Sequence, residues 1–178
     1  MATIASTFWR DGNRVPITGH GLVAIKSITF TGDAATVATP IFTITGVVEV
    51  LKLWGVVTTA LENHTDAHLR VNDQTASDQV LSKTTTLDLS DISVGAAIIK
   101  NGLAAAVLSY RTSDAASILE PAVADEKSFS PVIIAQKTGS IQTDIEYVYT
   151  TSDSPTTGAM QFFAGWLPLS EDASLSSS

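Results

Sequence analysis

The clearest hydrophobic pattern lies in three stretches towards the end of the chain. Residues 141–150 alternate between apolar or β-branched side chains and mainly polar ones. That period of two is typical of a half-buried β-strand. The flanking runs, 131–136 and 159–167, are short and apolar, and turn-forming residues separate all three. The pattern predicts three consecutive antiparallel strands joined as a meander, which needs a second layer to cover it.

The first third of the chain predicts strands that could form this second layer. Residues 22–30 alternate like a strand, and 36–38 suit a brief edge strand before a proline. Residues 41–60 form the longest β-prone run, interrupted by Gly46 and Gly55. Because a strand glycine often marks a bulge or a bend between sheets, we expect two or three strand segments here. A buried helix is the alternative, but the many β-branched residues and the glycines disfavour it.

The middle of the chain has shorter and weaker patterns. Residues 61–67 predict a polar loop, 68–72 a short strand and 80–89 an alternating strand. A helical turn could begin at Asp91, since aspartate is a favoured N-cap. Asn101-Gly102 lies between two apolar runs and predicts a hairpin turn.

About eight to ten short strands without a fixed repeat favour an all-β fold. We expect one antiparallel β-sandwich domain, for which a jelly roll is one possible form, over residues 22–169. Residues 1–21 predict an extended N-terminal arm, because two aromatic residues stand in a segment with little regular pattern. Residues 170–178 are acidic and rich in serine, which predicts a flexible tail.

The amino-acid composition excludes some classes of function but does not identify one. The 178 residues are 44% hydrophobic and 16% charged, which fits a globular chain. A net charge of −8 disfavours the phosphate backbone of nucleic acid as a partner. The absence of cysteine excludes disulfides, thiolate metal sites and cysteine nucleophiles. No apolar run approaches the roughly 20 residues of a membrane span, and the first residues do not resemble a secretory signal, so we expect synthesis in a cytoplasm.

No residue set specifies a chemical reaction. His64 and His68 are four positions apart, but they lack the glutamate that a helical zinc-hydrolase motif requires. On a strand, the two histidines would align with Asp66 as a possible metal face. The simpler interpretation is that this segment is a polar loop. Asp144 and Glu146 share one strand face and could act as paired carboxylates, but a solvated face is the simpler interpretation. We therefore predict no catalytic residue, no bound metal and no cofactor.

The large apolar residues are the more informative ones. Trp54, Trp166, Phe162 and Phe163 are most simply core residues. Phe162 and Phe163 are adjacent in a strand-like run, so they must point to opposite faces, and one of those faces could meet another copy of the chain.

Four residues of the arm, Phe8, Trp9, Arg10 and Arg14, are candidates for partner binding. Aromatic residues and arginine are favoured anchors in protein interfaces. The alternative is that the two aromatic side chains cap the edge of their own core.

Three segments together resemble small structural proteins of tailed bacteriophages. They are TFWRDGNRVPIT near the start, WGVVTTALENHTDAHLRVNDQ in the middle, and QKTGSIQTDIEYVYTTSDSPTTGAMQFFAGWLPLS near the end. In style the chain is similar to head decoration (cement) proteins. The likeness extends over most of the chain and lies in overall texture, without a catalytic signature.

This resemblance implies a non-enzymatic virion protein that decorates or cements the capsid shell. It implies self-association, with a homotrimer as the expected form, and contacts with the major capsid protein or other virion proteins. The alternative within the virion is an adaptor or fibre-attachment protein of the tail or the head–tail connection. From a different class, a carbohydrate-binding β-sandwich would present a groove lined by exposed aromatics such as Trp54, Tyr147 or Trp166.

Overall fold

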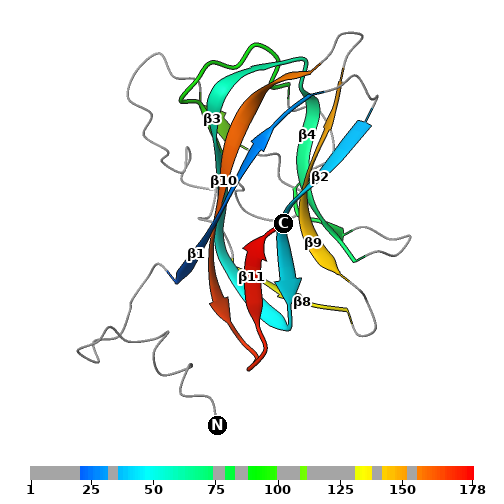
Figure 1. The fold of residues 1–178 in the computed structure, drawn as a ribbon, viewed down its shortest axis with the longest axis vertical. Coiled ribbons are helices and arrows are strands. Elements are labelled where there is room, and N and C mark those ends of the chain that lie inside the picture. The colour runs from blue at the N-terminus through cyan, green and yellow to red at the C-terminus, as the bar shows by residue number, and fades with distance from the viewer. Residues whose placement is uncertain are drawn as a thin grey trace, which may run out of the picture.

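The computed structural model describes residues 21–31, 36–73, 79–82, 88–99, 109–111, 131–137, 142–151 and 156–178. These form eleven strands (Figure 1). Their bounds are β1 Leu22–Thr29, β2 Thr36–Thr45, β3 Val47–Glu62, β4 Thr65–Asn72, β5 Gln79–Val80, β6 Ala97–Ile99, β7 Ser109–Arg111, β8 Val132–Ala135, β9 Thr143–Thr150, β10 Thr157–Pro168 and β11 Ser174–Ser177.

Two antiparallel sheets pack against each other as a β-sandwich, which confirms the predicted fold class. The first sheet has the order β1-β10-β3-β6-β7, and β8 also pairs with β3. The second sheet has the order β11-β2-β9-β4-β5. Figure 1 shows β1, β3 and β10 in one layer and β2, β4 and β9 in the other.

The core fills the space between the two sheets with side chains from alternate positions of each strand. From β10, Met160, Phe162 and Ala164 are buried, and from β9, Ile145, Tyr147 and Tyr149 are buried. This is the expected result of a strand period of two, because every second residue faces the opposite sheet. The outer faces of the two sheets do not contribute to this core, and so they carry the residues that remain available for other roles.

The predicted meander is wrong in its pairing, although all three of its strands exist. β8 and β10 pair with β3 in the first sheet, whereas β9 pairs with β2 and β4 in the second. Successive strands here cross from one sheet to the other. Alternation reveals that a segment is a strand, but it carries no information about which other strand will be its neighbour.

Gly46 marks the point at which the chain changes sheets, as the predicted bend between sheets requires. It has a φ of 65° and separates β2 from β3. Gly55, in contrast, lies inside the unbroken sixteen-residue strand β3, so the predicted interruption there is wrong. Residues 36–38 begin the longer strand β2, so the predicted strand is not brief; they pair only with β9, because β11 pairs with residues 42–45. Pro40 is accommodated by a register shift in the pairing of β2 with β9.

The predicted flexible tail is wrong for residues 174–177, which form β11. This strand pairs with β2, and Leu175 is buried in the core. Before it, the Ser170 hydroxyl accepts a hydrogen bond from the Val47 amide at 2.9 Å and donates one to Asp172 at 2.7 Å. Leu175 alone anchors this serine-rich strand in the core, and the backbone of β2 supplies the hydrogen bonds of the strand.

Three predictions in the middle of the chain differ from the structure. Residues 61–67 are not a loop, because β3 extends to Glu62 and β4 begins at Thr65. In place of a helical turn at Asp91, the chain forms a bridge between Ile92 and Leu61. The predicted turn at Asn101-Gly102 lies outside the described residues, between the paired strands β6 and β7. Of the strand predicted at 80–89, the described part contains only the end of β5.

Gly158 is a position where we expect alanine to be costly. Its φ is 118°, and a Cβ atom would lie 2.5 Å from the Ala60 carbonyl oxygen and 2.9 Å from the Leu61 Cα. Because these atoms belong to the backbone and cannot move aside, Gly158→Ala should lower the free energy of unfolding by about 2 kcal/mol. Urea denaturation followed by tryptophan fluorescence measures the change.

Gly55→Ala is the matched control for this substitution. There the added Cβ would lie 2.9 Å from the terminal methyl of Met160 and 3.1 Å from two ring atoms of Phe162, and these side-chain atoms can shift more easily than backbone atoms. We expect a loss below about 1 kcal/mol. Equal losses in the two variants would contradict the strain argument.

Candidate functional site

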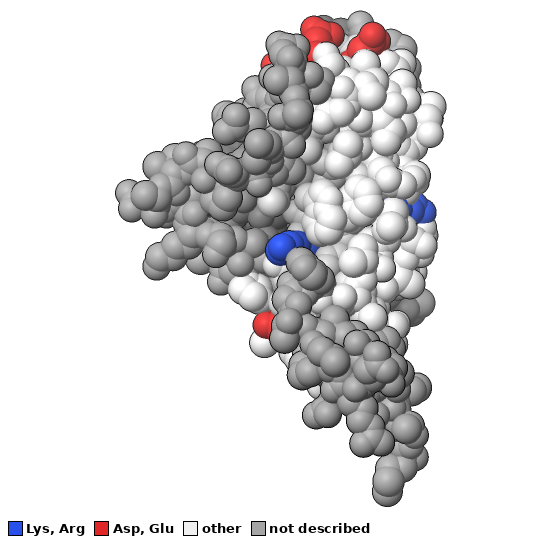
Figure 2. Space-filling view, turned by 90° about the vertical axis from the view of Figure 1, so that its left-hand side faces the viewer, with Lys and Arg blue, Asp and Glu red and all other residues white. Residues whose placement is uncertain are grey.

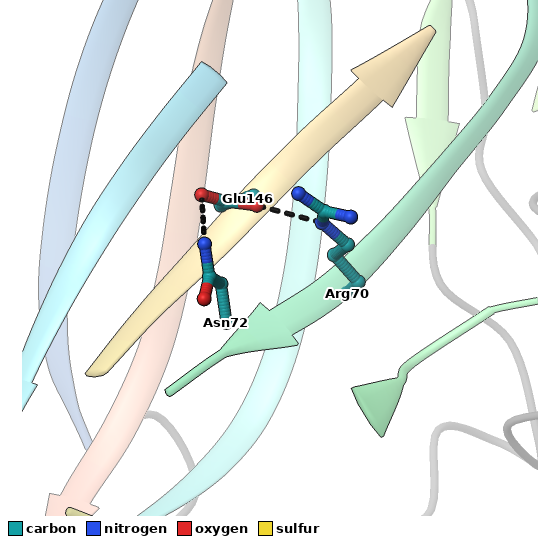
Figure 3. Close-up of polar contacts among 3 residues, drawn as sticks. All are labelled: Arg70, Asn72 and Glu146. Carbon is teal, nitrogen blue, oxygen red and sulfur yellow. Dashed lines mark hydrogen bonds and ion pairs between the residues drawn. The ribbon is translucent and has the colours of Figure 1, made fainter. Parts of the chain in front are cut away.

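A buried polar network lies on the outer face of the second sheet (Figure 3). Glu146, on the central strand β9, is directly opposite Arg70 of β4. Arg70 Nε donates to Glu146 Oε2 at 2.7 Å, and Asn72 Nδ2 donates to Oε1 at 2.9 Å. The Glu146 side chain is 5% exposed and that of Arg70 is 24% exposed. Both carboxylate oxygens of Glu146 are therefore engaged by β4.

Asp144 forms the equivalent connection on the other side of β9. It lies opposite Thr43 of β2, whose hydroxyl donates to Asp144 Oδ1 at 2.7 Å. The Gln142 amide donates to the same oxygen at 3.0 Å. Asp144 is 1% exposed. The two carboxylates together connect the central strand to its neighbours on both sides.

The prediction of a solvated carboxylate face is therefore wrong. Asp144 and Glu146 are buried because β9 is flanked on both sides, and the neighbouring strands place polar side chains beside them. A buried carboxylate is stable only when charged or polar donors satisfy it, as they do here. The two carboxylates connect β9 to its neighbouring strands by hydrogen bonds. They are not arranged as an acid and a base that face a substrate.

A second buried cluster surrounds His64, at the crossing from β3 to β4. The imidazole is fully buried and lies 4.3 Å from the ring of Tyr149 and 4.6 Å from that of Phe30 (centroid distances). Among the described residues, neither ring nitrogen has a hydrogen-bond partner. Removal from water penalises the charged form, so burial lowers the pKa of His64 from 6.5 to about 4.

Both interpretations of the histidine pair fail. His64 is a core residue and not part of a polar loop, whereas Asp66 is exposed and His68 is half-buried. The three side chains do not form the metal face that alternation on a strand would give. Within the ranges that the structure describes, no group of three or more His, Cys, Asp or Glu side chains could hold a metal ion.

The aromatic candidates separate into core and surface residues. Phe162 and Trp166 are buried, as predicted. Trp54 and Phe163 are half-buried on the outer face of the first sheet, with rings stacked at 5.1 Å and 6°. Phe162 and Phe163 thus point to opposite faces, as predicted. The sugar-binding groove is not formed by its proposed residues, because Tyr147 and Trp166 are buried.

The outer face of the first sheet is apolar and partly exposed. The register aligns Ile25, Phe163, Trp54 and Ile99 across four adjacent strands. Val23 and Ile25 are 55% and 50% exposed, and Ile133 of β8 is 64% exposed. Figure 2 shows this side of the molecule as a broad surface with few charged residues.

The predicted partner-binding residues, Phe8, Trp9, Arg10 and Arg14, lie outside the described residues, as does most of the predicted arm. None of the described segments forms a helix long and apolar enough to cross a membrane.

Sequence reasoning missed the Arg70–Glu146–Asn72 network, the burial of His64 and the apolar surface row. A weak signal existed for the network, because Arg70 and Asn72 are two apart on one strand, as are Asp144 and Glu146. Only the register shows that these pairs meet.

Comparison with protein-family models, with curated proteins and with solved structures finds no match for this chain.

Proposed function

We propose that this chain is a non-enzymatic structural protein that works by assembly, in the role of a capsid decoration protein of a tailed phage. The virion setting is proposed from the resemblance of the three sequence segments named above. The self-association is proposed from the molecular surface. A homotrimer that contacts the major capsid protein is the form that we expect.

One observation carries the proposal of assembly: the apolar row on the outer face of the first sheet. A monomeric protein seldom exposes a continuous apolar surface without a function for it. Here two strongly exposed aliphatic side chains of β1, Val23 and Ile25, adjoin the stacked pair of Trp54 and Phe163. The buried carboxylates on the other sheet are held by hydrogen bonds, which favours a structural role for that face.

Removal of residues 1–14 tests the role of the predicted arm. We expect the shortened chain to retain its β-sheet circular dichroism, because β1 begins only at Leu22. It should, however, sediment as a monomer and fail to bind capsids. Unchanged sedimentation and unchanged capsid decoration would contradict the proposal.

The alternative, a tail or head–tail connection protein, differs in copy number. Quantitative mass spectrometry of particles that carry the chain should find hundreds of copies for a shell protein. A dozen copies or fewer would favour the tail position.

A further inference from the structure

The exposed apolar side chains lie where the chain enters the first sheet. β1 is the outermost described strand of that sheet, with β10 on its inner side. Val23 lies opposite Gly165 and Ile25 opposite Phe163, so β1 and the aromatic stack form one continuous surface. Polar or charged side chains on an edge strand discourage unwanted pairing, but the outward positions at this end of β1 hold Val23 and Ile25.

The aromatic stack makes this surface a rigid platform. Trp54 and Phe163 lie opposite each other on β3 and β10 and pack with nearly parallel rings. A rigid aromatic surface loses little conformational entropy when a partner binds, and aromatic residues dominate the binding energy of interfaces. The platform therefore suits an apolar or aromatic anchor.

The chain itself contains such an anchor. Twenty residues precede Gly21, and they include the adjacent aromatic residues Phe8 and Trp9. Gly21 has a φ of 62° and contacts the Trp166 carbonyl so closely that an added Cβ would lie 2.5 Å from its oxygen. The preceding segment thus joins the domain at one end of the apolar surface.

The reach of this segment covers the apolar surface of its own copy and also that of a neighbouring copy. Phe8 lies thirteen positions before Gly21, so an extended segment places it up to about 45 Å away. The eight residues of β1 span only about 26 Å. Because this reach exceeds the length of β1, the aromatic pair can extend to a neighbouring molecule, and the proposed self-association selects that neighbour as the partner.

We propose that Phe8 and Trp9 of one copy dock on the outer face of the first sheet of a second copy, at Ile25, Trp54 and Phe163. This inference rests on the proposed assembly role and specifies its contact. Exchange of an arm between identical chains adds the same contact once for each subunit. It therefore suits a closed ring such as a trimer.

The chain contains no cysteine, so pairs of single-cysteine variants can test the contact directly. Thr7→Cys places a thiol beside Phe8, and Ser27→Cys places one on the exposed side of β1, two residues from Ile25. A mixture of the two variants should form a disulfide-linked heterodimer on mild oxidation. Ser176→Cys, on an exposed position of β11 in the other sheet, is the matched control and should not form one with Thr7→Cys.

A second variant measures the contribution of the surface. Val23→Thr combined with Ile25→Thr keeps β-branched side chains but removes apolar contact. We expect at least tenfold weaker self-association by sedimentation equilibrium, with unchanged circular dichroism. Val80→Thr, on β5 of the second sheet and 40% exposed, is the control that should leave self-association unchanged.

The outcomes separate this inference from the proposed function. An oligomer that withstands the double substitution and yields no Thr7–Ser27 cross-link would overturn the docking site and leave the assembly role intact. If a single chain that carries both Thr7→Cys and Ser27→Cys forms only an intramolecular disulfide, the proposed exchange between copies is wrong. A wild-type chain that remains monomeric at all concentrations would overturn both.

Discussion

Replacement of Glu146 by leucine should lower the free energy of unfolding by about 3–4 kcal/mol. The carboxylate is buried and receives hydrogen bonds from Arg70 and Asn72, so its removal takes one charged acceptor away from a partly buried guanidinium and from an amide. Loss of one partner from a buried pair typically costs about 3–5 kcal/mol, and the remaining exposure of Arg70 favours the lower part of that range. Urea denaturation measures the change.

Two controls identify the source of this loss. Glu62→Gln alters an exposed glutamate that accepts a hydrogen bond from the Thr157 hydroxyl, and it should change stability by less than about 0.5 kcal/mol. Arg70→Met combined with Glu146→Leu removes both charges and should recover a large part of the loss. If the double variant is as unstable as the sum of the single variants, the ion pair is not the cause.

Acid should destabilise the protein through His64. The pKa of its imidazole is about 4 in the folded state because of burial, against 6.5 when exposed. The unfolded chain therefore binds the proton more tightly, and stability falls as the pH drops from 6.5 to 4. Above pH 6.5 this histidine contributes no pH dependence. The total loss below pH 4 is about 3 kcal/mol for this one group.

The described residues that pack against His64 offer no compensating charge. The rings packed against it belong to Phe30, Tyr147 and Tyr149, and burial raises the pKa of both tyrosines, so they stay neutral. On its own turn, Glu62 and Asp66 are exposed to solvent. The backbone contact, from the Leu89 amide to the His64 carbonyl at 2.7 Å, is unaffected by the ring.

Unfolding curves of the wild type and of His64→Leu, measured at several pH values between 7.5 and 3.5, test this prediction. The difference in stability between the two proteins should shift by about 3 kcal/mol in favour of the variant as the pH falls. His68→Gln, a half-buried position on β4, controls for the loss of any histidine. A difference that stays constant across the range would show that His64 is not the responsible group.

The strands could be predicted from the sequence, but their neighbours could not. Alternation identified the segments of β1 and β9, because each side chain of a strand reports its own face, and a short apolar run identified that of β10. Pairing depends on contacts between distant segments: β1 pairs with residues 159–166, which lie at least 130 positions away. No local pattern carries that information, and so the meander was a wrong extrapolation from three correct strands.

The same limit applies to the candidate sites. Asp144 and Glu146 resemble surface residues in their own segment and become buried only through Thr43, Arg70 and Asn72 from other strands. His64 likewise stands among polar residues in the sequence, but Phe30 and two residues of β9 enclose it. That Phe162 and Phe163 face opposite ways was predictable from their adjacency, but which of them faces the core was not.

The pairing of β1 with β10 also bears on when the protein can fold during its synthesis. During synthesis β1 cannot pair until β10 has been made, and β2 likewise cannot pair with β9 until that strand has been made. Neither sheet can close before nearly the whole chain has emerged, and contacts so distant in sequence form slowly. The apolar row across β1, β10 and β3 therefore does not exist on a nascent chain. Copies translated side by side cannot join through it until β10 of each copy has emerged from the ribosome.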